Sequence, residues 1–77
     1  MSEYAIVTGG SQGIGLAVCR RLKQDGSGVI IFDRVAPEDS DLGEFRAVDL
    51  SDIEATAAAL DWALEGREVS RLVNNVG

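Results

Sequence analysis

Glycine is concentrated in one short segment near the beginning of the chain. Residues 8–15 read Thr-Gly-Gly-Ser-Gln-Gly-Ile-Gly and stand between an apolar run at residues 4–7 and an amphipathic stretch that begins at Ile14. This order predicts a strand, a tight turn and a helix, which direct free backbone N–H groups and the positive end of a helix dipole at one point. The chemistry that such a turn supports is the binding of a phosphate group.

The glycines of this turn are expected to have separate mechanical roles. Gly9 and Gly10 can adopt the positive φ that a sharp turn needs, and Gly13 lets a pyrophosphate approach the backbone. Gly15 allows the first helical turn to pack against the strand. A glycine cluster can also be an ordinary flexible loop, and the spacing is G-x-x-x-G-x-G rather than the general G-x-G-x-x-G. The strand before it and the helix after it favour a dinucleotide.

Asp33 has the position of a second cofactor-binding residue. It ends the apolar run at residues 29–32, about 20 residues beyond the turn, where dinucleotide-binding folds place an acid on the ribose hydroxyls. A carboxylate there repels the 2′-phosphate of NADP, and Gln12 in the turn adds no positive charge. Arg34 could instead clamp a phosphate, but beside Asp33 we expect it to stack on adenine or to be solvated. The charge balance favours NAD, with NADP as the alternative.

These segments together resemble the short-chain dehydrogenase/reductase (SDR) superfamily. Residues 8–15 resemble its cofactor loop, T-G-x-x-x-G-I-G, and Asp49-Leu50 resembles its Asp-Val or Asp-Leu pair. Residues 74–77, Asn-Asn-Val-Gly, are similar to its Asn-Asn-Ala-Gly motif with Val in place of Ala. The resemblance implies that Asp49 faces the adenine amino group and that the second Asn and the Gly of the last motif lie against the adenosine ribose.

The predicted cofactor-binding residues come from four segments that follow four predicted strands. They are Gly9, Ser11, Gln12, Gly13, Ile14, Gly15, Asp33, Arg34, Asp49, Leu50, Asn75, Val76 and Gly77.

The resemblance also implies which residues this chain lacks. The family uses a Tyr as general acid/base, a Lys four residues later, a Ser and an Asn, all beyond the Asn-Asn-Ala-Gly motif. Tyr4 is the one tyrosine here, and four residues later stands Thr8. We therefore expect no catalytic residue in the chain, which resembles roughly the N-terminal third of a dehydrogenase, the first part of an NAD(P)-binding Rossmann domain over residues 1–77.

Two hypotheses for function follow. In the first, the chain is the cofactor-binding part of an NAD-dependent oxidoreductase that transfers hydride between nicotinamide and a carbonyl or secondary alcohol. A companion polypeptide would then carry the Ser, Tyr and Lys, the complete enzyme would be a homo-oligomer, and the chain alone would be inactive. In the second, the chain is a truncated module that binds a nucleotide or a partner protein without catalysis.

Length and composition limit the alternatives. A chain of 77 residues is about half of a common domain. Seven basic against thirteen acidic residues give a net charge of −6, which argues against nucleic acid or an anionic membrane as partner. The absence of His argues against a zinc or other metal site and against a Ser-His-Asp triad. The lone Cys19, expected to be partly buried, and the absence of a signal segment or a long apolar run predict a cytoplasmic protein.

The periodicity of the chain predicts the elements that position these residues. Strands are expected at residues 4–8, 29–33, 45–48 and 69–74, with an acidic loop at 36–44. Strands that alternate with helices imply right-handed crossovers and a doubly wound parallel sheet of order 3-2-1-4, the N-terminal half of a Rossmann-type α/β fold.

Two helices are predicted between these strands. The inward faces are expected to carry Ile14, Ala17, Val18 and Leu22 in the first helix and Ile53, Ala57, Leu60 and Leu64 in the second. Ser51 and Glu54 are expected to form a capping box at the start of the second helix, Gly66 to end it, and Trp62 to pack at its flank.

Overall fold

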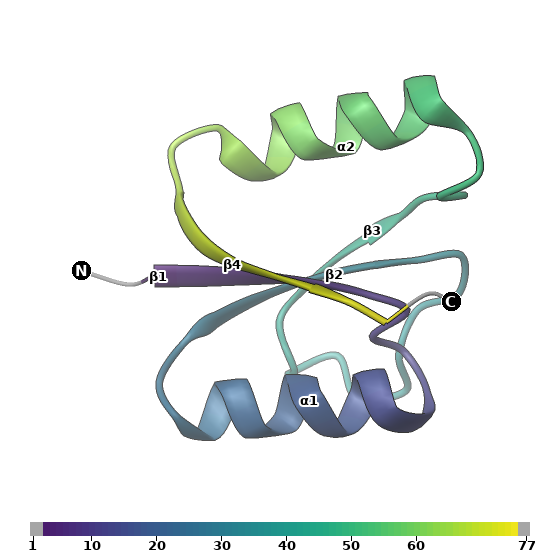
Figure 1. The fold of residues 1–77 in the computed structure, drawn as a ribbon. Helices are drawn as coiled ribbons and strands as arrows, with labels where there is room; N and C mark the ends of the chain where they lie inside the picture. Colours follow the sequence, from purple (N-terminus) through teal and green to yellow (C-terminus); the bar gives the residue numbers. More distant parts are fainter. Residues whose placement is uncertain (1–2, 76–77) are drawn as a thin grey trace.

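The computed structural model describes residues 3–75 as a four-stranded parallel sheet between two helices (Figure 1). The elements are β1 (Glu3–Thr8), α1 (Gly13–Gln24), β2 (Gly28–Asp33), β3 (Glu44–Ala47), α2 (Ile53–Leu64) and β4 (Glu68–Asn74). The strand order is β3-β2-β1-β4, and α1 and α2 cover opposite faces of the sheet. The predicted Rossmann-type arrangement is therefore confirmed.

Parallel pairing brings the carboxyl ends of the strands to one edge of the sheet. Thr8 pairs with Phe32 of β2 and with Asn74 of β4, and Asp33 pairs with Ala47 of β3. In Figure 1 this edge lies on the right, where α1 and α2 both begin. The polar segments singled out in the sequence all follow strand ends, so the topology gathers them at this edge.

The core lies on both faces of the sheet. Against α1 it contains Ala5, Val7, Cys19, Leu22, Val29, Ile31 and Leu42. Against α2 it contains Ile6, Ile30, Phe32, Val48, Ala59 and Ala63. The apolar run at residues 29–32 is thus buried on both sides, as predicted for a parallel strand between two helices.

The inward face of α1 differs from the predicted one. Of the predicted residues, Leu22 is buried, Val18 is half-buried, Ala17 is exposed and Ile14 is 75% exposed. Gly15 and Cys19 face the sheet instead. A Cβ at Gly15 would overlap the carbonyl oxygen of Gly9, so this contact fixes the rotation of the helix. Positions three and four residues apart then share its inward side.

The inward face of α2 was also predicted wrongly. Ile53, Ala57, Leu60 and Leu64 are exposed, to 83% for Ile53 and 54% for Leu64. Ala59 and Ala63 pack against the sheet, and Trp62 packs at the flank as predicted. Large side chains such as Ile30 and Phe32 already fill this face of the sheet, so the thin alanine side of the helix gives the closer fit.

The start of α2 is one residue later than the predicted capping box. Asp52 is the N-cap, and its side chain accepts a hydrogen bond from the N–H of Ala55 at 3.1 Å. Ser51 instead donates its hydroxyl to Asp49 at 2.6 Å, which removes it from the capping role. Strand β3 also begins and ends one residue before the predicted range of 45–48.

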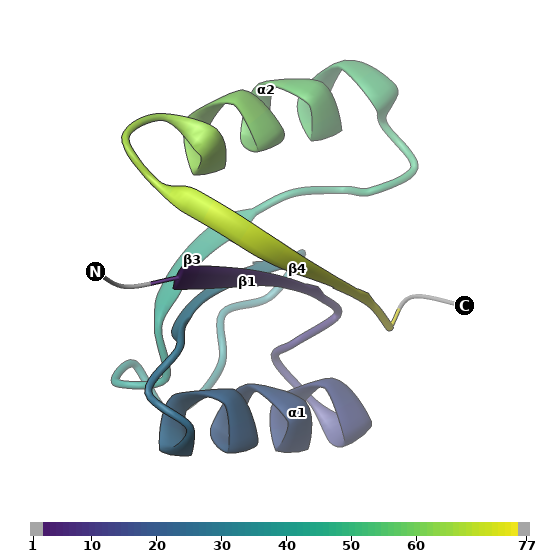
Figure 2. The ribbon, with the colours of Figure 1, turned by 60° about the vertical axis from the view of Figure 1, so that its left-hand side comes forward.

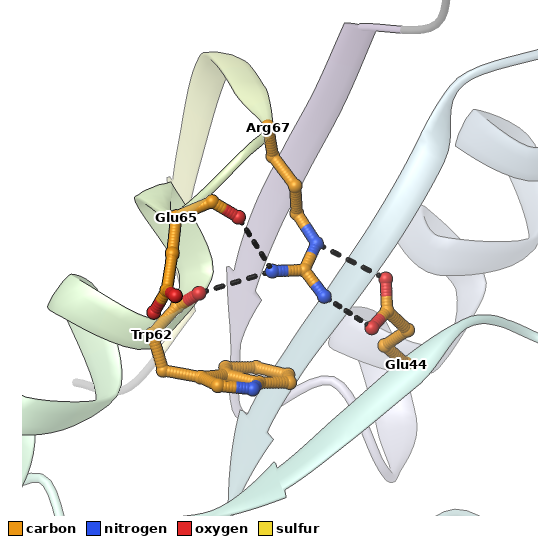
Figure 3. A network of polar contacts seen from close by, with 4 residues as sticks. All are labelled: Glu44, Trp62, Glu65 and Arg67. Atoms are coloured by element: carbon orange, nitrogen blue, oxygen red, sulfur yellow. Dashed lines mark hydrogen bonds and ion pairs between the residues drawn. The ribbon is translucent and has the colours of Figure 1, made fainter.

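A cluster around Arg67 joins the two edge strands at the amino end of the sheet (Figure 3). The guanidinium donates to both carboxylate oxygens of Glu44, at 3.2 and 2.5 Å, and to the carbonyl oxygens of Trp62 and Glu65 at 3.0 and 3.5 Å. It also lies 4.8 Å from the Trp62 ring centre and 5.7 Å from that of Tyr4. The Glu44 carboxylate raises the pKa of Arg67 further above its ordinary value.

Replacement of Arg67 by glutamine is expected to lower the thermal unfolding midpoint by about 4 to 8 °C, because it removes the bidentate ion pair and the stacked cation together. The measurement is a thermal melt of the protein with any polypeptide that copurifies. Arg71→Gln is the matched control, since Arg71 is an exposed arginine of β4, the strand that follows Arg67. Equal midpoints for the two variants would show that the Arg67 cluster does not stabilise the fold.

Among residues 3–75, neither helix is long and apolar enough to cross a membrane.

Candidate functional site

The glycine turn joins β1 to α1 at the carboxyl edge of the sheet. Gly9 and Gly13 have φ of 68° and 60°, values that L side chains rarely adopt. Gly10 does not have a positive φ, contrary to expectation. A Cβ at Gly10 would lie 2.9 Å from Cys19 Sγ and 3.0 Å from Ile31 Cγ2, so this glycine serves close packing of the turn on the core.

The outer side of the turn is open. A Cβ built at Gly13 meets no atom of the described chain within 4 Å. Gln12 is the N-cap of α1, and within the described residues its side chain makes no capping hydrogen bond. The first N–H groups of the helix therefore keep their donor capacity, and the dipole adds positive potential there. An anionic group such as a pyrophosphate fits this surface by charge and by space.

Asp33 lies beside the turn with its carboxylate already oriented. One oxygen accepts from the N–H of Ser11 at 3.2 Å, and the other accepts from the N–H of Arg34 at 2.7 Å. The hydroxyl of Ser11 donates to the carbonyl oxygen of Val35 at 2.5 Å. Each carboxylate oxygen keeps a further lone pair, so Asp33 can still accept hydrogen bonds from a ligand.

Four of the predicted cofactor-binding residues line one hollow of about 280 Å³. Its lining consists of Asp33, Arg34, Val48, Asp49, Leu50 and Ser51. The ends of β2 and β3 are held together here by the N–H of Val48, which donates to the carbonyl oxygen of Asp33 at 2.9 Å. Hydrogen bonds from the hydroxyl and N–H of Ser51 lower the pKa of Asp49. Asp49 is therefore an ionised acceptor at neutral pH.

A hydrogen-bond network at the end of β4 supports the glycine turn. The side-chain amide of Asn75 donates to the carbonyl oxygen of Gly9 at 3.2 Å. The Thr8 hydroxyl accepts from the N–H of Asn75 at 3.0 Å and lies within donating distance of Asn74 Oδ1 (3.1 Å) and of the Val73 carbonyl oxygen (3.3 Å). Asn75 thus braces the glycine turn against the end of β4.

Thr8 is a site residue for which sequence reasoning gave no role. It stands immediately before the first glycine, is only 8% exposed, and joins β1 to β4 through its hydroxyl. The sequence did hold a signal for this role, because Thr8 is a hydroxyl residue at the last position of an otherwise apolar predicted strand. Ile14, predicted to touch cofactor, is exposed beside the open side of the turn. Val76 and Gly77 lie outside the described residues.

Two reactive side chains take no part in this edge of the sheet. Cys19 is fully buried against Gly10, and burial raises the pKa of its thiol, which disfavours the thiolate that a nucleophile requires. The structure thus buries Cys19 more completely than the expected partial burial. Tyr4 lies near the amino end of the sheet beside Arg67, far along β1 from the glycine turn.

A hollow of about 370 Å³ at the amino end of the sheet is a poor candidate site. It is lined by Glu3, Asp25, Gly26, Ser27 and Glu68. Three carboxylates in this lining repel a phosphate, so the carboxyl edge is the better candidate.

The comparison with known families agrees with this geometry. A family model described as short chain dehydrogenase matches residues 3–77. The chain belongs to the short-chain dehydrogenase family.

Individual relatives in this family support the same assignment. A probable NADP-dependent dehydrogenase of Haemophilus influenzae is 42% identical over 95% of this chain and 32% of its own length. A galactitol 2-dehydrogenase of Cereibacter sphaeroides is 38% identical, also over 95% of this chain and 32% of its own length. The solved structure of an aldohexose dehydrogenase from Thermoplasma acidophilum superimposes with a TM-score of 0.92 and 31% identity, over 99% of this chain and 30% of that one. The chain thus spans about a third of the length of these short-chain dehydrogenases.

Proposed function

We propose that this chain is the cofactor-binding part of an NAD-dependent short-chain oxidoreductase. A bound nicotinamide dinucleotide supplies hydride transfer to a carbonyl or from a secondary alcohol. The observation that carries the proposal is the open glycine turn beside an oriented carboxylate, Gly13 and Asp33, at the ends of neighbouring strands. The glycine turn suits a pyrophosphate, and the Asp33 carboxylate suits the hydroxyls of a ribose.

Most of the predicted residues have a place in this proposal. The N–H groups of residues 12–15 would hold the pyrophosphate, while Ser11 holds the Asp33 carboxylate that would accept from the adenosine ribose. The hollow lined by Arg34, Asp49 and Leu50 suits the adenine ring by its size and its mixture of apolar and acceptor groups. Asn75, with Val76 and Gly77 beyond it, would lie on the ribose side of the turn.

We prefer NAD to NADP on electrostatic grounds. Both oxygens of Asp33 are held by backbone N–H groups, so the carboxylate is fixed in place as an acceptor. A dianionic 2′-phosphate beside this charge is repelled. NADP remains the alternative, because Arg34 is adjacent and the Haemophilus relative carries NADP in its name.

The rest of the oxidoreductase would pack on the uncovered side of β4. Figure 2 shows β4 at the near edge of the sheet. Leu72 of β4 is 63% exposed and, with Leu60 of α2, lines an apolar hollow of about 330 Å³. The right-handed crossover rule places a helix that follows β4 on the face covered by α2, over these leucines. We propose that a companion polypeptide or chain extension with the Ser, Tyr and Lys occupies this surface.

Two further properties belong to the same proposal. The single cysteine, Cys19, is a buried thiol, which suits a reducing cytoplasm. The complete enzyme is proposed to be a homo-oligomer, as is usual in the family.

The test is a titration of NAD into the protein as isolated, combined with an intact-mass spectrum of everything that copurifies. We expect NAD binding, a second polypeptide or a longer chain, and dehydrogenase activity only when that remainder is present. Residues 1–77 expressed alone are expected to be poorly folded and inactive, because β4 has an unpaired edge.

A different outcome would favour the second candidate function, a non-catalytic binding module. The observation that favours a binding module is that the described core already covers both faces of β1 and β2. A sharp, cooperative thermal transition of residues 1–77 alone, with nucleotide binding and no copurifying polypeptide, would support the module and contradict the oxidoreductase part.

A further inference from the structure

The hollow proposed for adenine has one wall formed by the segment that connects β3 to α2. Residues 48–52 make up this connection, and four of them, Val48, Asp49, Leu50 and Ser51, line the hollow. β3 ends directly before this short segment and α2 begins directly after it (Figure 1). The position of Asp49 therefore depends on how β3 and α2 are held relative to each other.

Few apolar contacts hold β3 to α2. The strand has four residues, lies at the edge of the sheet and, within the described part of the chain, pairs with β2 alone. Phe45 packs on the core on the α1 side, and no residue of β3 belongs to the described core on the α2 side. Side chains alternate along a strand, so Glu44 and Arg46 lie on the face opposite to Phe45, toward α2.

Charged and aromatic side chains make the contact between β3 and α2 instead. The guanidinium of Arg46 lies 5.0 Å from the centre of the Trp62 ring, and that of Arg67 lies 4.8 Å from the same centre. Arg67 also donates to both carboxylate oxygens of Glu44 and to the carbonyl oxygen of Trp62 (Figure 3). At such distances the face of an aromatic ring attracts a cation. These four residues, two from β3, one from α2 and one from the turn after α2, form an arginine–tryptophan clamp.

We propose that this clamp positions the adenine end of the cofactor, because it holds β3 against α2 and thereby fixes residues 48–52 between them. The hydroxyl and the N–H of Ser51 both donate to Oδ1 of Asp49, so the carboxylate moves together with this segment. None of the clamp residues lines the hollow, so they act as positioning residues. The inference rests on the proposed dinucleotide-binding function and assigns a role in it to residues outside the cofactor motifs.

The test compares the affinity for NAD with that for nicotinamide hypoxanthine dinucleotide, in which a carbonyl oxygen replaces the adenine amino group. The Asp49 carboxylate can accept a hydrogen bond from the amino group and repels the oxygen. The protein, produced with any polypeptide that copurifies, should bind NAD about tenfold more tightly than the analogue in isothermal titration. Arg46→Gln should reduce this ratio to about two- to threefold, which is the scale of an exposed cation–π contact. Arg46 is exposed, so its replacement leaves the core intact.

The ratio of the two affinities distinguishes a positioning role from a general loss of stability. A lower fraction of folded protein weakens the apparent binding of both dinucleotides equally, and their ratio stays the same. A misplaced Asp49 carboxylate weakens the binding of NAD alone.

Three further variants make the result specific. Trp62→Leu removes the ring and should reduce the ratio as Arg46→Gln does, whereas Trp62→Phe keeps an aromatic face and should retain most of it. Arg21→Gln is the matched control, because Arg21 is an exposed arginine of α1, which covers the opposite face of the sheet from α2.

The outcomes separate this inference from the proposed function. An unchanged ratio in Arg46→Gln and Trp62→Leu, or an equal fall in Arg21→Gln, would overturn the role of the clamp in a protein that still binds NAD, and the proposed function would stand. Equal affinity of the unmodified protein for the two dinucleotides would also overturn it, since Asp49 then does not bind the adenine amino group. Binding of neither dinucleotide by the unmodified protein would overturn both the clamp and the proposed function.

Discussion

Replacement of Asp33 by alanine is expected to weaken NAD binding by about 1.5 to 3 kcal/mol, the scale of hydrogen bonds to a charged group. This corresponds to about ten- to a hundredfold in the dissociation constant. The same change removes the carboxylate that would repel a 2′-phosphate, so NADP binding should improve. Gln12→Arg in addition should move the preference further, because it supplies a cation next to Ser11, whose N–H holds the Asp33 carboxylate.

The measurement is the ratio of kcat/KM for the two cofactors in the complete enzyme, with binding constants from titration. Asp61→Ala is a suitable control, because Asp61 is an exposed carboxylate of α2 and its loss changes the net charge equally. A preference of the unmodified protein for NADP would show that the role given to Asp33 is wrong. Arg34 would then be the residue that reads the 2′ position.

Replacement of Gly13 by valine is expected to abolish measurable cofactor binding. The side chain would enter the open space outside the turn, where the structure has no atom of the described chain within 4 Å. Each hydrogen bond from the backbone to a phosphate that is lost costs about 1.5 to 3 kcal/mol. The fold should remain, although the φ of 60° adds strain of about 1 to 2 kcal/mol for any L side chain.

Gly26→Val is the control that distinguishes the effect of backbone strain from the loss of cofactor binding. Gly26 has φ of 87°, and a Cβ there also meets no atom of the described residues within 4 Å, but it lies at the opposite end of α1 from Gly13. Both variants should therefore melt at similarly lowered temperatures, and only the Gly13 variant should lose NAD in a titration. Retained affinity in the Gly13 variant would remove the turn as the binding site.

The sequence alone was sufficient for the topology because the signals for it are local. An unbroken apolar run such as residues 29–32 indicates a strand buried on both faces, and glycines with polar neighbours mark where strands end. The order of strands and helices then leaves few permitted topologies, because crossovers are right-handed. Asp33 was predicted from its place at the end of a strand, and Asp49 and Asn75 were predicted from the family resemblance. The topology brings all three strand ends to one edge of the sheet.

Helix orientation could not be predicted in this way. In α2 the most hydrophobic positions, such as Ile53 and Leu64, predict the wrong inward face. The hydrophobicity of a side chain indicates that it favours burial, but it does not indicate which surface will cover it. The sheet below is already filled by large side chains, so Ala59 and Ala63 fit against it. In α1 a backbone contact between Gly15 and Gly9 sets the rotation, and no periodicity in the sequence reports such a contact.

What the sequence by itself determined is the family, the parallel sheet and the residues that follow each strand. Only the tertiary structure decided what those residues touch. Ser11 bonds to Asp33 and Val35, Thr8 bonds to Asn75, and Glu38 and Asp39 border the glycine turn. These contacts join residues far apart in the chain, and their distances depend on how the strands pair and how closely the helices pack.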